Sequence, residues 1–198
     1  LDFGEQDYHG DSGPITIRRY PKDELEPQHQ AFLDSADALG YPYCPDANDP
    51  NGYGAGPQPM NKLGRLRISA AVGYLAPARI RSNLTVRADT TVRRLMFKGA
   101  RCTGAEIQPS AAPDGEQVSA IGARLVILSA GALMSPTVLL RSGIGPQDQL
   151  SHLGVETVRQ APGVGQNLSD HPALGVVCEV RDPSMIDFDR PIIQTILR

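Results

Sequence analysis

The N-terminal quarter of the chain shows one alternating stretch and one helical periodicity. Residues 14–18 alternate apolar and polar side chains, which predicts a half-buried strand. Residues 27–39 have the spacing of an amphipathic helix, and Gly40 stands where a helix C-terminus is expected. The predicted apolar face consists of Phe32, Ala36 and Leu39.

Residues 41–64 lack periodicity and are rich in Pro and Gly. A connection of this length without periodicity is usually a functional or a disordered loop. We therefore expect it to act as a lid or as a contact with a partner subunit. A short helix is predicted over residues 68–75, closed by Pro77.

The middle of the chain predicts antiparallel strands. Residues 83–87 and 91–97 read as strands, and residues 102–107 return after a turn at 99–101. A second turn is expected at Pro113-Asp114-Gly115. This pattern indicates a hairpin.

A continuous apolar run, Leu125 to Leu128, is typical of a parallel strand covered on both faces. It leads directly into the small residues Ser129, Ala130 and Gly131. Ser135 as N-cap and Pro136 at the first helical position then predict a short helix that ends at Gly143.

The C-terminal part repeats this mixture of elements. Pro146 and Gly154 bracket another predicted helix, and the turn 162–165 leads to a strand over 174–180. Parallel-type and hairpin-type strands occur together along the chain. The pattern therefore indicates segments of two interleaved domains rather than one compact domain.

Composition places the chain among soluble globular proteins, with 40% hydrophobic and 21% charged residues in 198. A net charge of −3 and a pI near 5.8 argue against binding to nucleic acid or an anionic membrane surface. No apolar run approaches the roughly 20 residues of a membrane span. The three scattered cysteines, Cys44, Cys102 and Cys178, favour reduced thiols and a cytoplasmic location.

The histidines give no pattern of metal ligands, so no metal site and no catalytic residue is assigned. His9, His29 and His152 are expected on the surface. His171 follows Asp170, but neighbouring residues of an extended chain point to opposite sides, so a structural role is expected. A basic cluster on the hairpin is expected to be a solvated face; it consists of Arg93, Arg94, Lys98 and Arg101.

Residues 131–145 carry the most informative motif. A predicted strand comes directly before them. They begin with small residues, continue as a capped helix and end in a Gly-x-Gly turn. Small residues at the carboxyl end of a parallel strand let a ribose or a phosphate approach the backbone. The local pattern alone leaves a plain strand-to-helix crossover open as well.

The full string from Gly131 to Gly145 resembles the second signature of the glucose–methanol–choline (GMC) oxidoreductase family. Residues 8–14 are similar to the family's entry into its substrate domain, and residues 81–86 to the strand before its adenine-contacting segment. Residues 162–172 are similar to its return to the substrate domain. The resemblance covers nearly the whole chain in the family's order.

This resemblance implies an α/β, or mixed α+β, fold. Parts of an FAD-binding Rossmann-like domain would be interleaved with parts of an antiparallel-sheet substrate domain. The implied boundaries are 1–64 for a substrate-domain segment with the long loop, 65–160 for an FAD-domain segment, and 161–198 for the return to the substrate domain.

The resemblance also implies an FAD-dependent enzyme that oxidises a CH–OH group of a small-molecule alcohol. The flavin takes a hydride while a protein base removes the hydroxyl proton. Val92 matches the position whose backbone contacts adenine, and Ser129, Ala130 and Gly131 match the strand end near the FAD ribose and pyrophosphate. No nucleic-acid or membrane partner is implied, and a homo-oligomer stays open.

Two parts of the family pattern are missing from this sequence. It has no Gly-x-Gly-x-x-Gly turn for the pyrophosphate and no C-terminal region with the catalytic His. We therefore interpret the chain as an interior fragment that cannot perform the chemistry alone. Two alternatives stay open: a hydroxynitrile lyase of the same family, and a non-catalytic binding module.

Overall fold

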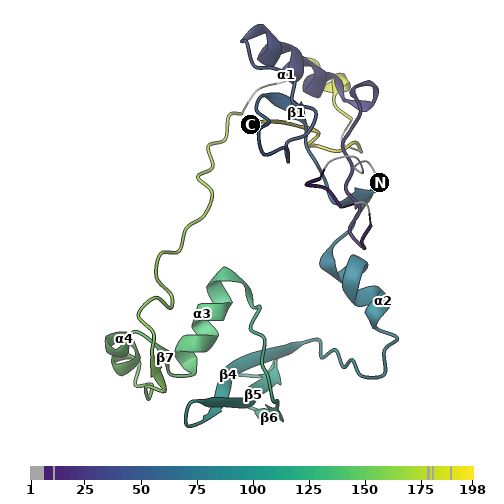
Figure 1. Ribbon diagram of the computed structural model, residues 1–198. Coiled ribbons are helices and arrows are strands. Elements are labelled where there is room, and N and C mark those ends of the chain that lie inside the picture. The colour runs from purple at the N-terminus through teal and green to yellow at the C-terminus, as the bar shows by residue number, and fades with distance from the viewer. Residues whose placement is uncertain (1–6, 11, 178, 180, 188) are drawn as a thin grey trace. The chain divides into compact units, whose positions relative to one another are not determined.

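The computed structural model describes residues 7–10, 12–177, 179, 181–187 and 189–198. The chain divides into two compact units (Figure 1). Unit 1 consists of residues 1–84 and 177–198, and unit 2 consists of residues 85–176. Both units combine short helices with small β-sheets, which confirms the mixed α/β class.

Unit 1 is built around helix α1 (Pro27–Ala38) and a two-stranded antiparallel sheet of β1 (Ala55–Pro57) and β9 (Thr195–Leu197). The predicted helix is confirmed, and Gly40 follows its end with a φ of 86°. Its buried side chains are Leu33 and Ala36, which pack with Ala55, whereas Phe32 and Leu39 are exposed. The predicted apolar face was therefore right at Ala36 and wrong at Phe32 and Leu39, and the buried neighbour is Leu33.

The remaining elements of unit 1 are short. They are η1 (Lys22–Glu24), β2 (Lys62–Leu63) paired antiparallel with β3 (Leu66–Arg67), the π-helix η2 (Ala71–Leu75), α2 (Ala76–Ala78) and η3 (Pro183–Met185). The helix expected over 68–75 begins later and continues through Pro77 into α2, so Pro77 does not close it.

Residues 14–18 do not form the predicted strand. Only Arg18 is paired, through two backbone hydrogen bonds with Met60 of 2.8 and 2.9 Å. Residues 83–87 also lack strand pairing. Both stretches alternate apolar and polar side chains, but a strand also requires a partner strand along its length.

Part of the Pro- and Gly-rich segment 41–64 is packed within unit 1. Cys44, Asp46 and Ala55 are buried. A Cβ on Gly54 would lie 2.0 Å from the carbonyl oxygen of Pro42, and a Cβ on Gly56 1.6 Å from that of Cys44. Glycine is therefore required here because two backbone stretches lie in direct contact.

The C-terminal segment is held against α1 by buried polar contacts. Gln194 is 1% exposed, and its side chain accepts from the Glu26 amide at 2.8 Å and donates to the Glu24 carbonyl at 3.3 Å. His29 contacts the hydroxyl of Thr195 at 2.9 Å. A segment far away in the sequence thereby completes the core of unit 1.

Unit 2 contains a three-stranded antiparallel sheet in the order β4-β5-β6, with β4 at Thr90–Lys98, β5 at Arg101–Pro109 and β6 at Ser119–Gly122. The predicted hairpin is confirmed, as is the turn after Pro113, whose carbonyl accepts from the Glu116 amide. Gly104 allows β6 to approach, since a Cβ there would lie 2.0 Å from the Ile121 carbonyl oxygen.

The predicted parallel strand at 125–128 is extended but unpaired. Leu125 and Ile127 are 79% and 81% exposed. A buried parallel strand needs neighbours on both edges, and the described residues provide none for this stretch. The sequence signal identified an apolar run correctly, but the expected covering is absent from the described part of the chain.

Helix α3 (Gly131–Arg141) begins four residues before the expected N-cap. Ala130 is the N-cap, Pro136 lies inside the helix, and the hydroxyl of Ser135 accepts from the Ala130 amide at 3.1 Å. The assignments of Ser135 and Pro136 were therefore wrong, because the Gly131 backbone starts the helix earlier. The predicted end at Gly143 is confirmed by its φ of 80°.

Two further elements complete unit 2. Strand β7 (Ile144–Gly145) pairs in parallel with β8 (Arg159–Gln160), and α4 (Gln147–His152) lies between Pro146 and Gly154 as predicted. Residues 174–177 are not a strand and their Leu and Val side chains are exposed. Positions 178 and 180 of that predicted strand lie outside the described residues.

Candidate functional site

Ser129, Ala130 and Gly131 lie at the end of the extended apolar run, where α3 begins, and all three are exposed. Gly131 has a φ of 83°, a conformation that side-chain-bearing residues rarely adopt. A Cβ at Gly131 would meet nothing within 4 Å. Glycine is therefore used here for its backbone conformation, and the space beside it is open to a ligand.

The N-terminus of α3 is a favourable place for an anion. The helix has eleven residues, and neither a side-chain cap nor an acidic residue in its first turn offsets the positive end of its dipole. The first amides of a helix have no carbonyl partners within the helix, so they can donate to a phosphate. This geometry fits the pyrophosphate of a dinucleotide.

Val92 lies on β4 of the same unit and is partly exposed. The link between β4 and α3 is Ser142, whose hydroxyl accepts from the Leu95 amide at 2.7 Å and donates to the Val138 carbonyl at 2.5 Å. Gly131 lies at the other end of α3, about 15 Å from Arg141 along the helix axis. Val92 and the residues 129–131 thus lie in the same unit, but they do not form one cluster.

The basic cluster on the hairpin is partly neutralised by carboxylates. Arg94 donates to both oxygens of Glu106, at 2.8 and 2.6 Å, and the Nε of Arg93 lies 3.2 Å from Asp114. The hydrogen bonds and charge of Arg94 lower the pKa of Glu106, and Glu106 in turn raises the pKa of Arg94. The Arg94 side chain is 56% exposed, as expected of a solvated face, whereas that of Arg93 is only 28% exposed.

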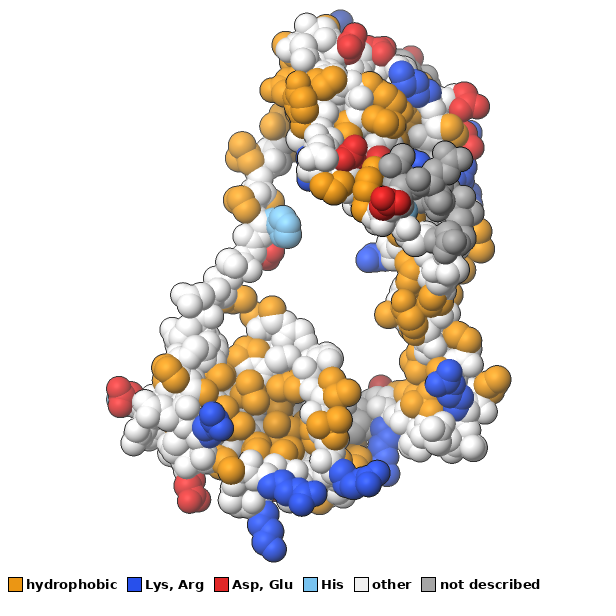
Figure 2. All heavy atoms as spheres, in the orientation of Figure 1, with side chains coloured by type: hydrophobic (Ala, Val, Ile, Leu, Met, Phe, Trp, Pro, Cys, Tyr) orange, Lys and Arg blue, Asp and Glu red, His pale blue; other side chains and the backbone are white. Residues whose placement is uncertain are grey.

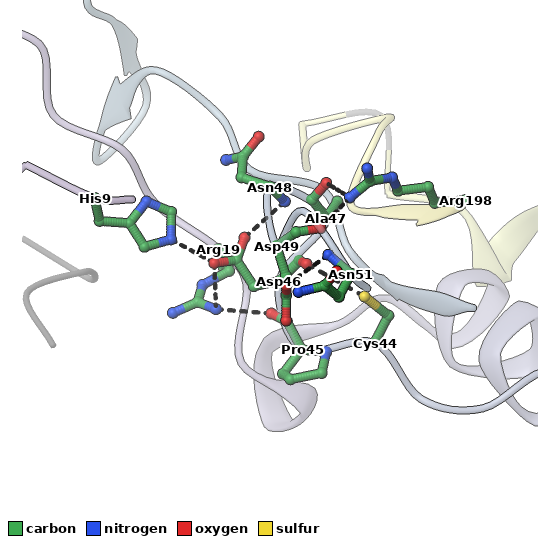
Figure 3. A network of polar contacts seen from close by, with 10 residues as sticks. All are labelled: His9, Arg19, Cys44, Pro45, Asp46, Ala47, Asn48, Asp49, Asn51 and Arg198. Atoms are coloured by element: carbon green, nitrogen blue, oxygen red, sulfur yellow. Dashed lines mark hydrogen bonds and ion pairs between the residues drawn. The ribbon is translucent and has the colours of Figure 1, made fainter. Parts of the chain in front are cut away.

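A polar network in unit 1 was missed by sequence reasoning (Figure 3). The ring of His9 contacts the carboxylate of Asp46, which also accepts from the Asn48 amide at 2.9 Å and lies 4.0 Å from Arg19. The His9 and Asp46 side chains are 10% and 8% exposed, so the surface prediction for His9 was wrong. The sequence Asp46-Ala47-Asn48 is typical of a turn, but nothing in the sequence indicates that His9, 37 positions away, contacts Asp46.

Asp46 is held in its charged form. Burial alone would raise the pKa of Asp46, but the hydrogen bonds from His9 and Asn48 and the charges of His9 and Arg19 together lower it. A carboxylate with a lowered pKa stabilises the fold fully above its unfolded pKa, which is about 3.9 for Asp, and this stabilisation is lost as the pH falls through the folded pKa.

We therefore expect Asp46→Asn to destabilise unit 1 by about 1–3 kcal/mol at pH 7, because a charge-assisted network is broken. The difference from the wild type should shrink as the pH falls below about 4. Thermal unfolding at several pH values measures both effects. Asp170→Asn, at a side chain that is 98% exposed, is the matched control. A pH-independent difference would contradict the assignment.

The other predicted polar residues are resolved as follows. His29 is half-buried against Thr195, so its surface prediction was wrong, whereas His152 is exposed. The His171 ring lies 3.7 Å from Asp170, closer than expected, but both side chains are fully exposed. Among the described residues, Cys44 and Cys102 are free thiols, and no group of three or more acidic, His or Cys residues could hold a metal. Cys178 lies outside the described residues.

No helix in the described part of the chain has both the length and the apolar character needed to cross a membrane.

The fold is mixed α/β, and the exposed start of α3 follows an extended, unpaired apolar stretch. The sequence of residues 7–173 matches the family model of GMC oxidoreductases. The chain therefore belongs to the GMC oxidoreductase family, as the signature predicted. The matching model describes the family's N-terminal region, so the segment corresponds to that region rather than to an interior one.

Similar proteins agree with this assignment. A GMC-type oxidoreductase of Rhodococcus erythropolis is 38% identical over 196 residues, covering 99% of this chain and 38% of that protein. Human mitochondrial choline dehydrogenase is 40% identical over 170 residues, covering 86% of this chain and 28% of that protein. The chain thus spans about a third of the length of these curated relatives.

Solved structures show the same fold. Pyridoxine 4-oxidase from Mesorbium loti matches with a TM-score of 0.70 and 34% identity, covering 78% of this chain and 29% of that one. An FAD-dependent oxidoreductase from Chaetomium thermophilum matches with a TM-score of 0.71 and 30% identity, covering 81% of this chain and 27% of that one.

Proposed function

We propose that the protein is an FAD-dependent oxidoreductase that acts on the CH–OH group of a small-molecule alcohol. The observation that carries this proposal is the open, uncapped start of α3 at Gly131, in a chain of the GMC family. The relatives support it, since those named above include a choline dehydrogenase, a pyridoxine 4-oxidase and an FAD-dependent oxidoreductase.

In this proposal unit 2 contributes to FAD binding. The backbone of Val92 would contact the adenine, and Ser129, Ala130 and Gly131 would lie along the ribose and pyrophosphate. The exposed small residues and the free first-turn amides of α3 fit a group of this shape and charge. When bound, the flavin supplies the acceptor for a hydride from the alcohol carbon. No catalytic residue is assigned to this chain.

The sequence-based boundaries remain part of the proposal: 1–64 and 161–198 with the substrate domain, and 65–160 with the FAD domain. A cytoplasmic location is proposed from the cysteine pattern. The lyase alternative has no support among the named relatives, which are oxidoreductases. Nothing in the described structure favours a non-catalytic binding module.

The test uses the intact protein, with whatever further residues its reading frame encodes. The purified protein is expected to show the visible absorbance of bound flavin, and this band should bleach when primary alcohols are added without oxygen. A flavin that stays oxidised with every alcohol, while a cyanohydrin is cleaved, would support the lyase instead. Protein that contains no flavin and takes up none would overturn the proposal.

A further inference from the structure

A cationic pocket of about 630 Å³ lies in unit 1 between residues 58–67 and the C-terminal segment 190–193. Its charged lining residues are Lys62, Arg65, Arg67 and Arg190, and no Asp or Glu is among the described residues that line it. The FAD proposal uses none of these side chains. Like charges gathered in one pocket repel one another, and a bound anion would offset that repulsion.

Two of these cations oppose each other directly. Lys62 and Arg67 are register partners in the β2–β3 hairpin, and like charges at opposite positions of an antiparallel pair are destabilising. Among the described residues, the Arg67 guanidinium has neither an ion pair nor a hydrogen bond, and Arg67 is exposed. An anion between the two side chains would remove this repulsion.

The surrounding chain contacts the side chains of Lys62, Arg65 and Arg190. Arg65 donates to the Asp189 carbonyl at 3.0 Å, and the Lys62 ammonium contacts the Tyr20 hydroxyl. Arg190 lies 3.4 Å from Glu26 and 3.7 Å from Asp187, so among the described residues it is the one charged lining residue that has an ion pair with a carboxylate. Lys62, Arg65 and Arg67 therefore leave an excess of positive charge.

Apolar side chains line the pocket beside these charges. Ile192 and Ile193 are 80% and 55% exposed, and Met60 also faces the pocket. Most ligand pockets combine an apolar wall with a few polar groups that fix orientation. We propose that this pocket binds a small organic anion, with its charged head between Lys62 and Arg67 and its apolar body against Ile192 and Ile193.

The test titrates octanoate into the intact protein by calorimetry. Octanamide has the same apolar body as octanoate but an uncharged head group, and inorganic phosphate has the charge but no apolar body. We expect both to bind at least about tenfold more weakly than octanoate. Octanoate binding should also weaken as salt rises, because the contacts of the head are electrostatic.

Lys62→Gln and Arg67→Gln should each weaken octanoate binding about tenfold. The matched control is Arg79→Gln, at an exposed arginine of unit 1 outside the pocket. Flavin content and thermal unfolding of each variant show whether it is folded. Octanoate and octanamide binding equally well, no octanoate binding at all, or unchanged binding to a folded Arg67→Gln variant would each overturn the proposal.

Discussion

Gly131→Val is expected to empty the FAD site of the intact protein while most of the fold persists. A β-branched residue is strongly disfavoured at a φ of 83°, with a strain of about 1–3 kcal/mol. The new side chain would occupy the open space where the proposal places the ribose and pyrophosphate. The ratio of flavin absorbance to protein absorbance measures the loss, and circular dichroism follows the fold.

Gly154→Val separates backbone strain from loss of the ligand site. Gly154 also has a positive φ, 67°, and a Cβ there would likewise meet nothing within 4 Å. It follows α4 in the same unit and has no part in the FAD proposal. This variant should lose stability but keep its flavin. A Gly131→Val protein with a full complement of FAD, or equal flavin loss in both variants, would refute the assignment.

The 198-residue chain expressed alone is expected neither to retain FAD nor to stay monomeric. The sequence has no Gly-x-Gly-x-x-Gly turn to hold the pyrophosphate. Hydrophobic side chains gather over α3 in Figure 2, where Leu133 and Met134 are exposed. The unpaired stretch around Ile127 adds an open backbone edge, and such edges favour association.

Incubation with excess FAD, removal of free ligand and size-exclusion chromatography with light scattering test both expectations. The protein fraction should carry no visible flavin band and should elute as oligomers or aggregates. The intact protein, treated identically, is the control. A monomeric chain with stoichiometric, tightly held flavin would show that these residues are sufficient for the site.

Local chemistry was enough to predict several elements. The helix α1, the β4–β5 hairpin and α4 follow from periodicity, turn residues and bracketing Pro and Gly. Gly40 and Gly143 end helices because only glycine adopts a positive φ without strain. The family also followed from the sequence, because its signature fixes many positions within fifteen neighbouring residues.

The sequence by itself therefore determined the family, the main hairpin and the C-terminal ends of α1 and α3, all of which depend on residues close together in the chain. Only the tertiary structure decided which polar residues meet. His9 and Asp46 are 37 positions apart, and Gln194 reaches the backbone of Glu26 across 168. It also decided that Leu125 to Leu128 stays unpaired, because strand formation depends on partners that an apolar run cannot specify.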